Sequence, residues 1–476
     1  MNAPAPVLEE TTALAGLLER QRAAFLREGP PDLDARRAAL EKLRAALLER
    51  RAALAAAISE DFGHRPSHET ALMELAPSLN LIDYLRRNLR RFMRPERRRV
   101  GIHFQSGSAR VEYQPLGVVG ILSPWNYPVF LTLTPLATAL AAGNRAMLKP
   151  SEFTPRTSAL LAETLAGAFS AEEVAVVQGD ARTGAAFCAL PFDHLFFTGS
   201  TAVGREAMRA ASANLTPVTL ELGGKSPVVV ARGGDLARIA EDVVYGKLAN
   251  AGQTCVAPDY ALIPHGEVEA FAAACDAAVA KLYPAGPTSP DYAAIANDRH
   301  FRRLQEMLAE AGEKGARIRL LGSRAQEAAS RPRTLAPALI LDATDEMKIL
   351  REEIFGPLLP VVPYRGIDEA IAWINARPRP LALYFFGPDD ADRRKLLART
   401  TSGGVTLNGV LMHVAQDDLP FGGVGASGMG ASHGPEGFRA MSHARAVFSQ
   451  HRWNGTRLLR PPFGETADRI LGFLLR

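Results

Sequence analysis

Residues 193–208 read DHLFFTGSTAVGREAM, a hydrophobic run that ends in a turn containing glycine. The run ends at Phe197, and Gly199, Ser200 and Gly204 lead directly into a segment with helical spacing. Glycines let the backbone approach an anion, and the free amide groups of a first helical turn stabilise negative charge. Because the spacing differs from G-x-G-x-x-G, it predicts either a phosphate-binding turn or an ordinary strand-to-helix turn.

Short β-rich runs and helical segments alternate on both sides of this turn. One series extends from Arg110 to the PVTLEL run ending at Leu222, and a second begins at Ser226 and continues through LALYFF at 381–386. Such alternation predicts crossover connections and mostly parallel sheets covered by helices on both faces. We therefore expect an α/β fold with at least two units, the first of them a nucleotide-binding domain. Before Arg110, apolar positions three and four apart predict amphipathic helices over 7–60 and 67–92.

Three segments fit neither series. Residues 102–113 (IHFQSGSARVEY) and the glycine-rich residues 421–438 are predicted to pair as an appended hairpin. The apolar run 470–475 is far shorter than the roughly 20 residues that span a bilayer. It predicts a surface helix or a partner contact.

Length and composition describe an ordinary globular protein. A chain of 476 residues exceeds what one hydrophobic core usually supports, so two or three domains are expected. With 47% hydrophobic and 22% charged residues, the chain is unlike disordered, collagenous or membrane-spanning proteins. The net charge of +4 reflects arginines gathered in residues 86–99, which we interpret as a solvated helix face and not as a binding site for nucleic acid or anionic lipid.

The three cysteines show neither paired nor metal-ligand spacing, so no metal site is predicted. The first residues also lack the basic and apolar regions of a secretion signal. These features predict a reducing, cytoplasmic location. Cys188 and Cys275 lie in apolar helical segments and are interpreted as packing residues, whereas Cys255 lies in the polar sequence NAGQTCVAPDY. We expect Cys255 to be an exposed thiol whose thiolate is favoured by nearby backbone amides.

Two further segments carry polar residues in apolar surroundings. Glu221 interrupts the strand-like VTLELGGKSP, where burial would raise its pKa and make it a general base, although a structural acceptor for loop amides is equally compatible. In PWNYP, Asn126 could donate a hydrogen bond to an oxyanion while Trp125 and Tyr127 form apolar pocket walls. A proline-bracketed turn would explain the prolines but not the asparagine.

Together these segments resemble the aldehyde dehydrogenase superfamily, and the resemblance extends over about residues 15–450. The motifs are PWNYP, KPSE, FTGSTAVG, ELGGKSP, GQTC, EEIFGP and LPFGGVGASGMG. Within the superfamily the chain is similar to the class 3 branch, in particular to bacterial coniferyl aldehyde dehydrogenases. The fold implied is a Rossmann-like NAD-binding domain, a second α/β catalytic domain and a small β oligomerisation hairpin, and the assembly implied is a homodimer. The expected bounds are 1–99 and 114–222 for the NAD(P)-binding domain, 223–415 for the catalytic domain, 100–113 and 416–450 for bridging segments, and 451–476 for a C-terminal tail.

The resemblance also implies a role for each site residue. It makes Cys255 the nucleophile, Glu221 the base that hydrolyses the thioester, and Asn126, with the amide of Cys255, the oxyanion hole. The cofactor contacts implied are Lys149 and Glu152 for the adenosine ribose, Gly199, Ser200 and Gly204 for the pyrophosphate, and Glu353 and Phe355 for the nicotinamide ribose and ring.

The activity implied is oxidation of an aromatic or long-chain aldehyde to the acid with NAD. NADP remains possible, although Glu152 would repel its extra phosphate. Fatty or general aldehyde oxidation is the main alternative. Three further alternatives are less favoured. An acylating dehydrogenase needs no hydrolytic base, and a thiol esterase needs no cofactor motifs. A cofactor-binding module that has lost catalysis has no need of Cys255, Glu221 and Asn126 together.

Overall fold

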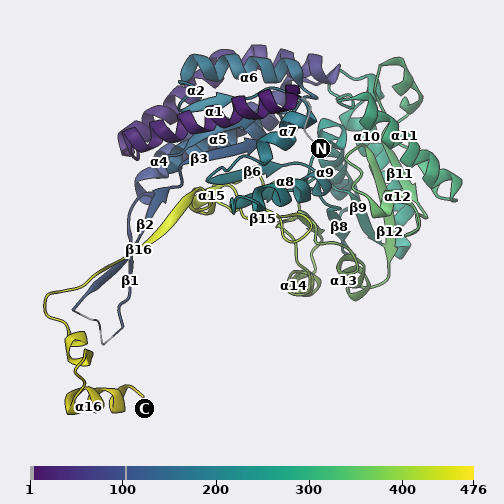
Figure 1. The fold of residues 1–476 in the computed structure, drawn as a ribbon. Helices are drawn as coiled ribbons and strands as arrows, with labels where there is room; N and C mark the ends of the chain where they lie inside the picture. Colours follow the sequence, from purple (N-terminus) through teal and green to yellow (C-terminus); the bar gives the residue numbers. More distant parts are fainter. Residues whose placement is uncertain (1–4, 102–103, 105, 476) are drawn as a thin grey trace.

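Two large, mostly parallel sheets covered by helices form the body of the molecule, and a smaller sheet projects from it (Figure 1). The computed structural model describes residues 5–101, 104 and 106–475. This arrangement confirms the α/β class predicted from the alternating runs.

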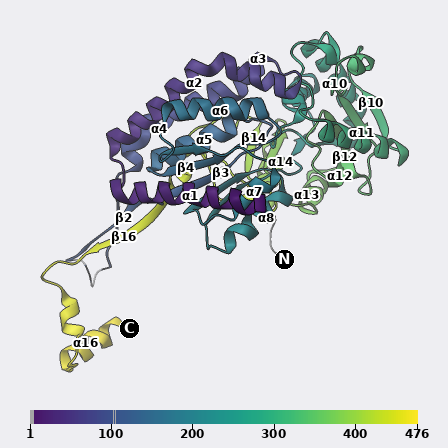
Figure 2. The same ribbon diagram turned by 45° about the horizontal axis from the view of Figure 1, so that its top comes forward.

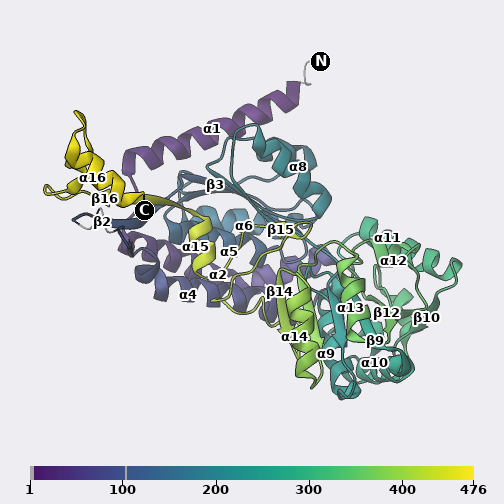
Figure 3. The same cartoon turned by 90° about the horizontal axis from the view of Figure 1, so that it is seen from below.

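The first sheet is covered by helices on both faces. Its strands are parallel except β15, which is antiparallel to β7. Successive strand residues enter opposite helix layers: Val118 packs with α1, α7 and α8, and Val119 with α2, α4, α5 and α6. Figure 3 shows α1 and α8 on one side of β3 and α2, α4, α5 and α6 on the other. Covering both faces explains why the strands read as continuous hydrophobic runs. In sheet order the strands are β15 (Gly428–Met429), β7 (Val218–Glu221), β6 (His194–Thr198), β3 (Val118–Leu122), β4 (Arg145–Lys149) and β5 (Val174–Val176).

The helices of this half comprise the predicted N-terminal helices and the crossovers. They are α1 (Ala5–Glu28), α2 (Leu33–Phe62), α3 (Ser67–Thr70), the π-helical turn η1 (Ala71–Leu75), α4 (Ala76–Phe92), α5 (Phe130–Ala142), α6 (Pro155–Ala168), α7 (Ala181–Cys188) and α8 (Thr201–Ser212).

The second sheet forms one continuous core with its helices. All its strands are parallel except β10, which is antiparallel to β11. In sheet order the strands are β10 (Arg317–Leu320), β11 (Ala338–Leu341), β12 (Leu358–Tyr364), β9 (Tyr260–Pro264), β8 (Pro227–Val230), β13 (Ala382–Phe386) and β14 (Gly404–Leu407). Its helical segments are α9 (Leu236–Leu248), the short η3 (Ala249–Gly252), α10 (Val268–Leu282), α11 (Asp298–Glu313), α12 (Lys348–Arg351), α13 (Ile367–Asn375) and α14 (Asp390–Arg399).

The third sheet extends away from the body (Figure 2). Its order is β1 (Glu96–Arg98), β2 (Ser108–Pro115) and β16 (Ser442–Ser449), with antiparallel neighbours. The predicted pairing of 102–113 with 421–438 is therefore wrong, because β2 pairs with β16. The glycine-rich run instead supplies β15, where a Cβ on Gly428 would lie 2.1 Å from the carbonyl oxygen of Leu220. Ile102, His103 and Gln105 lie outside the described residues.

The C-terminal residues form a surface helix, as the short apolar run predicted. This helix, α16 (Glu465–Leu474), follows α15 (Gly434–Ala440) and β16, and Ala467 is its buried residue. Phe473 and Leu475 are exposed at the far end of the molecule (Figure 1). In the ranges that the structure describes, no helix combines the length and the apolar character needed to cross a membrane.

The arginine-rich segment ends α4 and enters β1. Arg86 forms ion pairs with Asp83 and Glu41, and Arg91 lies 3.5 Å from a carboxylate oxygen of Asp418. These partly exposed ion pairs agree with the interpretation of a solvated helix face.

Candidate active site

A cavity of about 1820 Å³ is lined by loops from both large sheets. The carboxyl ends of parallel strands meet at one sheet edge, so the loops after β3, β4, β6 and β7 lie side by side there. Strands β4 and β5 follow β3 on one side of it in the sheet, and the chain then crosses back so that β6 pairs with β3 on its other side. Such a reversal is where α/β sheets bind ligands. Every predicted site residue lines this cavity except Gly204.

Gly204 lies away from the cavity wall and packs α8 against the chain that follows β7. A Cβ at this position would lie 2.5 Å from Cδ2 of Leu222. Glycine permits close packing of α8 here, and the contact of Gly204 with a pyrophosphate stays a prediction.

Cys255 follows a backbone turn of unusual conformation. Asn250, Ala251 and Gly252 are successive left-handed residues, with φ values of 51°, 50° and 77°. A Cβ on Gly252 would lie 2.3 Å from the carbonyl oxygen of Gly356, so glycine alone fits there. Non-glycine residues in this region cost about 1–3 kcal/mol and persist where the surroundings impose them. The turn brings Cys255 into the cavity from the second sheet.

The thiol of Cys255 is less exposed than the sequence predicted. It is partly buried and packs against the core of the second sheet. Burial, and then the negative charges of Glu353 and Glu221, raise its pKa to about 12, against a smaller lowering by the amides of Cys255 and Val256. The isolated protein therefore holds a protonated thiol, and its surroundings outweigh the activation expected from backbone amides.

Glu221 ends β7 and is 6% exposed. Its Oε1 accepts a hydrogen bond of 3.1 Å from the Ser432 hydroxyl, while its buried Oε2 has no partner in the described part of the chain. Burial raises the pKa of Glu221 to about 8, and the Ser432 bond lowers it by less. The structure thus holds the buried carboxyl of raised pKa that its position in the strand predicted. Ser432 was missed because it lies among small residues more than 200 positions later in the sequence.

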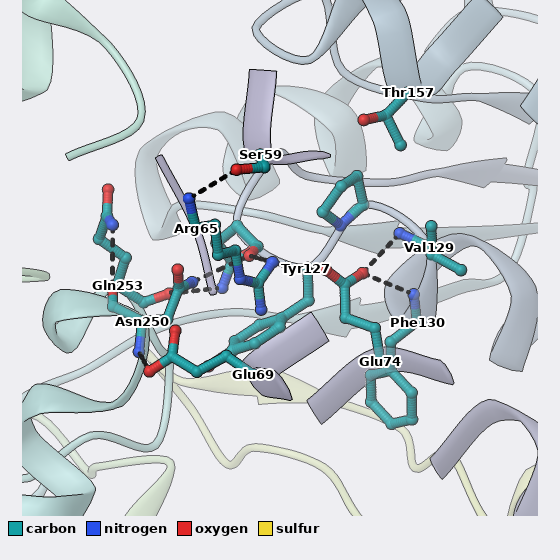
Figure 4. Close-up of polar contacts among 12 residues, drawn as sticks. Ser59, Arg65, Glu69, Glu74, Tyr127, Val129, Phe130, Thr157, Asn250 and Gln253 are labelled. Carbon is teal, nitrogen blue, oxygen red and sulfur yellow. Dashed lines mark hydrogen bonds and ion pairs between the residues drawn. The ribbon is translucent and has the colours of Figure 1, made fainter. Parts of the chain in front are cut away.

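The loop after β3 is tied directly to the loop that carries Cys255. Asn126 Nδ2 donates a hydrogen bond of 3.1 Å to the carbonyl oxygen of Gln253, and the hydroxyls of Tyr127 and Thr254 share one of 2.6 Å. Figure 4 shows Asn250 between Gln253 and Tyr127 in this view. The amide of Asn126 has one further N–H group available for a ligand.

Aromatic side chains form the adjacent wall. The Trp125 ring meets Phe355 edge-on, with centroids 5.5 Å apart, and lies 5.4 Å from His300. The His300 ring donates a hydrogen bond of 2.7 Å to the carbonyl oxygen of Phe355, whose φ is 53°. His300 therefore holds Phe355 in its strained conformation.

Glu353 follows Cys255 in the sequence, whereas the loop of Asn126 precedes it. A hydrogen bond to its backbone holds Glu353 in place. Burial and the charge of Asp259 raise its pKa to about 7. Arg303 donates to the carbonyl oxygen of Glu353 at 3.1 Å and also to that of Ile354. Neither Arg303 nor His300 was predicted, because the strongly amphipathic sequence of α11 resembles that of any surface helix.

The edge of the first sheet carries the remaining polar groups. Lys149, at the end of β4, is 2% exposed and donates to Glu152 at 3.1 Å. Ser200 caps α8 through its side chain, and Thr201 and Val203 of the first helical turn line the cavity. A carboxylate can accept from the ribose hydroxyls of a dinucleotide, and an ammonium group and a helix N-terminus can donate to its hydroxyls and phosphates.

Comparison with known proteins identifies the family. The model of the aldehyde dehydrogenase family matches residues 19–447. The chain belongs to the aldehyde dehydrogenase family. It is an NAD(P)-dependent oxidoreductase that acts on aldehydes.

Relatives of this aldehyde dehydrogenase include bacterial and mammalian proteins. It is 50% identical over 463 residues, 97% of this chain and 96% of the relative, to a protein of Pseudomonas aeruginosa named probable coniferyl aldehyde dehydrogenase. It is 39% identical over 448 residues, 94% of this chain and 90% of the relative, to aldehyde dehydrogenase family 3 member A2 of Pongo abelii. These relatives confirm the predicted class 3 branch.

Solved structures of the family share the whole architecture. The substrate-bound AldH of Staphylococcus aureus is 33% identical, with a TM-score of 0.91 and 100% of both chains covered. The aldehyde dehydrogenase of Mycobacterium tuberculosis in complex with NAD+ is 29% identical, with a TM-score of 0.84 over 93% of this chain and 91% of that one.

Proposed function

We propose that this aldehyde dehydrogenase oxidises an aromatic, coniferyl-type aldehyde to its acid, with Cys255 as nucleophile, Glu221 as hydrolytic base and Asn126 as oxyanion donor. The observation that carries the proposal is that these three side chains, from distant segments, line one cavity. The Cys255 thiol gives up its proton to solvent, and the thiolate sulfur attacks the aldehyde carbon. The resulting oxyanion accepts hydrogen bonds from the free N–H of Asn126 and from the amide of Cys255.

Glu221 acts after the aldehyde adduct of Cys255 has been oxidised to a thioester. Its unpartnered Oε2 is available to take a proton from water. A pKa of about 8 suits this step, because a base works best when its pKa is near the working pH. The same carboxyl argues against an acylating enzyme, which needs no hydrolytic base.

The cofactor would be held along the edge of the first sheet. We propose that 1–99 and 114–222 form the NAD(P)-binding domain, with Lys149, Glu152, Gly199 and Ser200 on the adenosine side. Glu353 and Phe355, from the catalytic domain of residues 223–415, would hold the nicotinamide ribose and ring. When bound, the nicotinamide ring supplies the hydride acceptor.

We propose NAD as the preferred cofactor. Lys149 is already paired with Glu152 at 3.1 Å, so it is less free to bind the extra phosphate of NADP. The carboxylate itself repels that phosphate and accepts ribose hydroxyls. Measured dissociation constants for both cofactors test this order, and tighter binding of NADP would reverse it.

The proposed substrate follows from the relatives and from the cavity wall. A relative at 50% identity bears the name probable coniferyl aldehyde dehydrogenase, and Trp125, Tyr127 and Phe421 supply flat apolar surface. The alternative is a fatty or general aldehyde, which the same apolar wall would also accept. Purified enzyme with NAD should be assayed against coniferyl, cinnamyl, benzyl and fatty aldehydes. Higher kcat/KM for coniferyl aldehyde is expected, and no activity on aromatic aldehydes would refute the substrate assignment.

Asn126→Ala tests the oxyanion role. One such donor is worth on the order of 3 kcal/mol, so the chemical step should slow by roughly a hundredfold. The rate is read from the first turnover of NADH formation. An unchanged first turnover would remove Asn126 from the mechanism.

We propose a homodimer in the cytoplasm, with the third sheet and the tail of residues 451–476 at the contact. β16 leaves one edge unpaired within the three-stranded sheet, and such edges accept further strands. The three cysteines are free, which suits a reducing compartment. Light scattering of the purified chain should give twice the monomer mass, and cell fractionation should recover the enzyme with the cytoplasm.

A further inference from the structure

A buried ionic cluster lies directly behind the oxyanion loop (Figure 4). Its centre is the ion pair of Arg65 and Glu74, whose side chains are 0% exposed and whose Nη1 and Oε1 lie 2.5 Å apart. Burying two charges costs several kcal/mol per ion before they attract each other, and apolar replacements often stabilise such positions. The attraction between Arg65 and Glu74 therefore does little more than offset the free energy of burying them. Their contacts with the oxyanion loop indicate another role.

Glu74 fixes the far end of the oxyanion loop. It lies in the π-helical turn η1, a distortion frequently found at functional sites. Its Oε2 accepts hydrogen bonds from the amides of Val129 at 2.7 Å and Phe130 at 3.1 Å. These amides open α5, which has no side-chain cap of its own. The negative charge at this helix N-terminus anchors the point where the loop ends.

Arg65 holds the middle of the same loop. Its Nη1 also donates to the carbonyl oxygen of Asn126 at 3.3 Å, and its guanidinium lies 4.8 Å from the centre of the Tyr127 ring. Arg65 thus contacts both the backbone of Asn126 and the aromatic ring of Tyr127.

Glu69 holds the opposite loop, which carries the nucleophile. Its Oε1 accepts from the amide of Asn250 at 3.0 Å, and Asn250 is the first of the left-handed residues before Cys255. The side chain of Asn250 in turn donates to the carbonyl oxygen of Asn126 at 3.0 Å. The Asn126 carbonyl therefore receives hydrogen bonds from both Arg65 and Asn250, and it joins the two loops.

We propose that Arg65, Glu69 and Glu74 are positioning residues that set the placement of Asn126 relative to Cys255 in the oxyanion hole. The inference rests on the proposed role of Asn126. None of the three residues lines the cavity. They act on the reaction by fixing two loops that come from different sheets.

A double-mutant cycle tests this coupling. Arg65→Lys keeps the charge beside Glu74 but shortens the side chain, so the nitrogen that reaches both Glu74 and Asn126 is withdrawn. The first-turnover rate should fall about tenfold, the effect of losing one hydrogen bond from a charged donor. In an Asn126→Ala background the same substitution should change the rate by less than about twofold, because its target is gone. The dissociation constant for NAD should stay unchanged.

Arg36→Lys is the matched control. Arg36 is also a buried arginine, on α2 before the loop that carries Arg65, but it donates to the carbonyl oxygens of Ala141 and Ala142 at the other end of α5. This variant should lower the thermal unfolding midpoint with little change in first-turnover rate. If Arg65→Lys folds poorly, Glu69→Gln serves in its place, since Glu69 is only partly buried and its amide oxygen can still accept a weaker bond.

The outcomes separate this inference from the proposed mechanism. A rate loss that is the same in both backgrounds, or a loss equal to that of Arg36→Lys, overturns the positioning role. No loss in Asn126→Ala alone overturns the proposed oxyanion donor instead. Hydrolysis of p-nitrophenyl acetate without cofactor should repeat the same pattern of losses, because it uses the same thiol and oxyanion hole.

Discussion

Cys255 and Glu221 share one cavity, and burial suppresses the ionisation that each of them needs. Burial raises both pKa values, and the negative charge of Glu221 adds to the raised pKa of Cys255. A free enzyme with a neutral thiol and a largely neutral carboxyl at pH 7 follows from this arrangement. Each group must therefore become reactive when substrate and cofactor change its surroundings.

Thioester hydrolysis should depend on the ionisation of Glu221. Because its pKa is raised to about 8, its basic form increases as pH rises through 8, and the hydrolysis rate should rise with it. Glu221→Gln should keep the first turnover of NADH, abolish this pH dependence and slow steady turnover by roughly a hundredfold or more. Stopped-flow traces from pH 6 to 9.5 would check this. A variant that lost the first turnover would place Glu221 before the thioester instead.

The thiol should respond to the neighbouring carboxylate of Glu353. The pKa of Glu353 is about 7. Among the charged groups that raise the pKa of Cys255, Glu353 has the largest effect. In Glu353→Gln this repulsion is absent, so alkylation of Cys255 by iodoacetamide should be several-fold faster at pH 9. At pH 6, where Glu353 is mostly neutral, the two proteins should react alike.

Peptide mass spectrometry can follow the site of alkylation. Cys188 and Cys275 are buried and should stay unmodified, and Cys255→Ala gives the background. Equal rates at pH 9 would show that Glu353 does not act on the thiol through its charge.

Among the elements, the parallel strands were the most predictable. Their hydrophobic runs are buried on both faces, and the glycine turns after them leave a clear pattern. The site residues at their ends could be found because each polar residue interrupts an apolar segment. The hairpin was mispaired because β16 reads SHARAVFS and is exposed along most of its length, so no core pattern marks it.

Residues that act through distant contacts left no such signal. Ser432 approaches Glu221 only because β15 pairs with β7. Arg65 lies in the loop between α2 and α3 and Glu74 lies in η1, in a charged stretch whose sequence resembles a solvated surface, although the structure buries both. Their importance depends on tertiary packing against the loop after β3, which residue spacing does not encode.

The turn before Cys255 can be tested with a pair of glycines. Gly252→Ala must place a Cβ at a φ of 77° and against the carbonyl oxygen of Gly356, whereas Gly29→Ala meets a φ of 71° with nothing within 4 Å. The left-handed backbone costs about 1–2 kcal/mol in both variants. Overpacking should add about 1–3 kcal/mol in Gly252→Ala alone. Thermal unfolding should show the larger loss for Gly252→Ala, with first-turnover activity lost as well, and equal midpoints would contradict the requirement for glycine.

In the whole molecule, each large sheet supplies part of a cavity that neither could form alone. The first contributes Asn126, Glu221 and the dinucleotide-binding edge, and the second contributes Cys255 and Phe355. The ionic cluster of Arg65, Glu69 and Glu74 links the loops from both sheets near the base of this cavity. The third sheet and α16 contribute nothing to the cavity lining in the described residues, which frees them for contacts with another chain.

Deleting residues 451–476 should weaken the proposed dimer and leave the body intact. In one chain this tail buries little, and Trp453, Phe463, Phe473 and Leu475 are 71%, 67%, 74% and 84% exposed. The truncated chain should keep its first-turnover rate, while sedimentation at decreasing protein concentration shows dissociation that the full chain resists. Phe473→Ser in the full chain, which keeps the helix, should shift the equilibrium in the same direction. An unchanged dissociation constant in both variants would assign the contact to the three-stranded sheet alone, because the unpaired edge of β16 would then suffice to hold the partner.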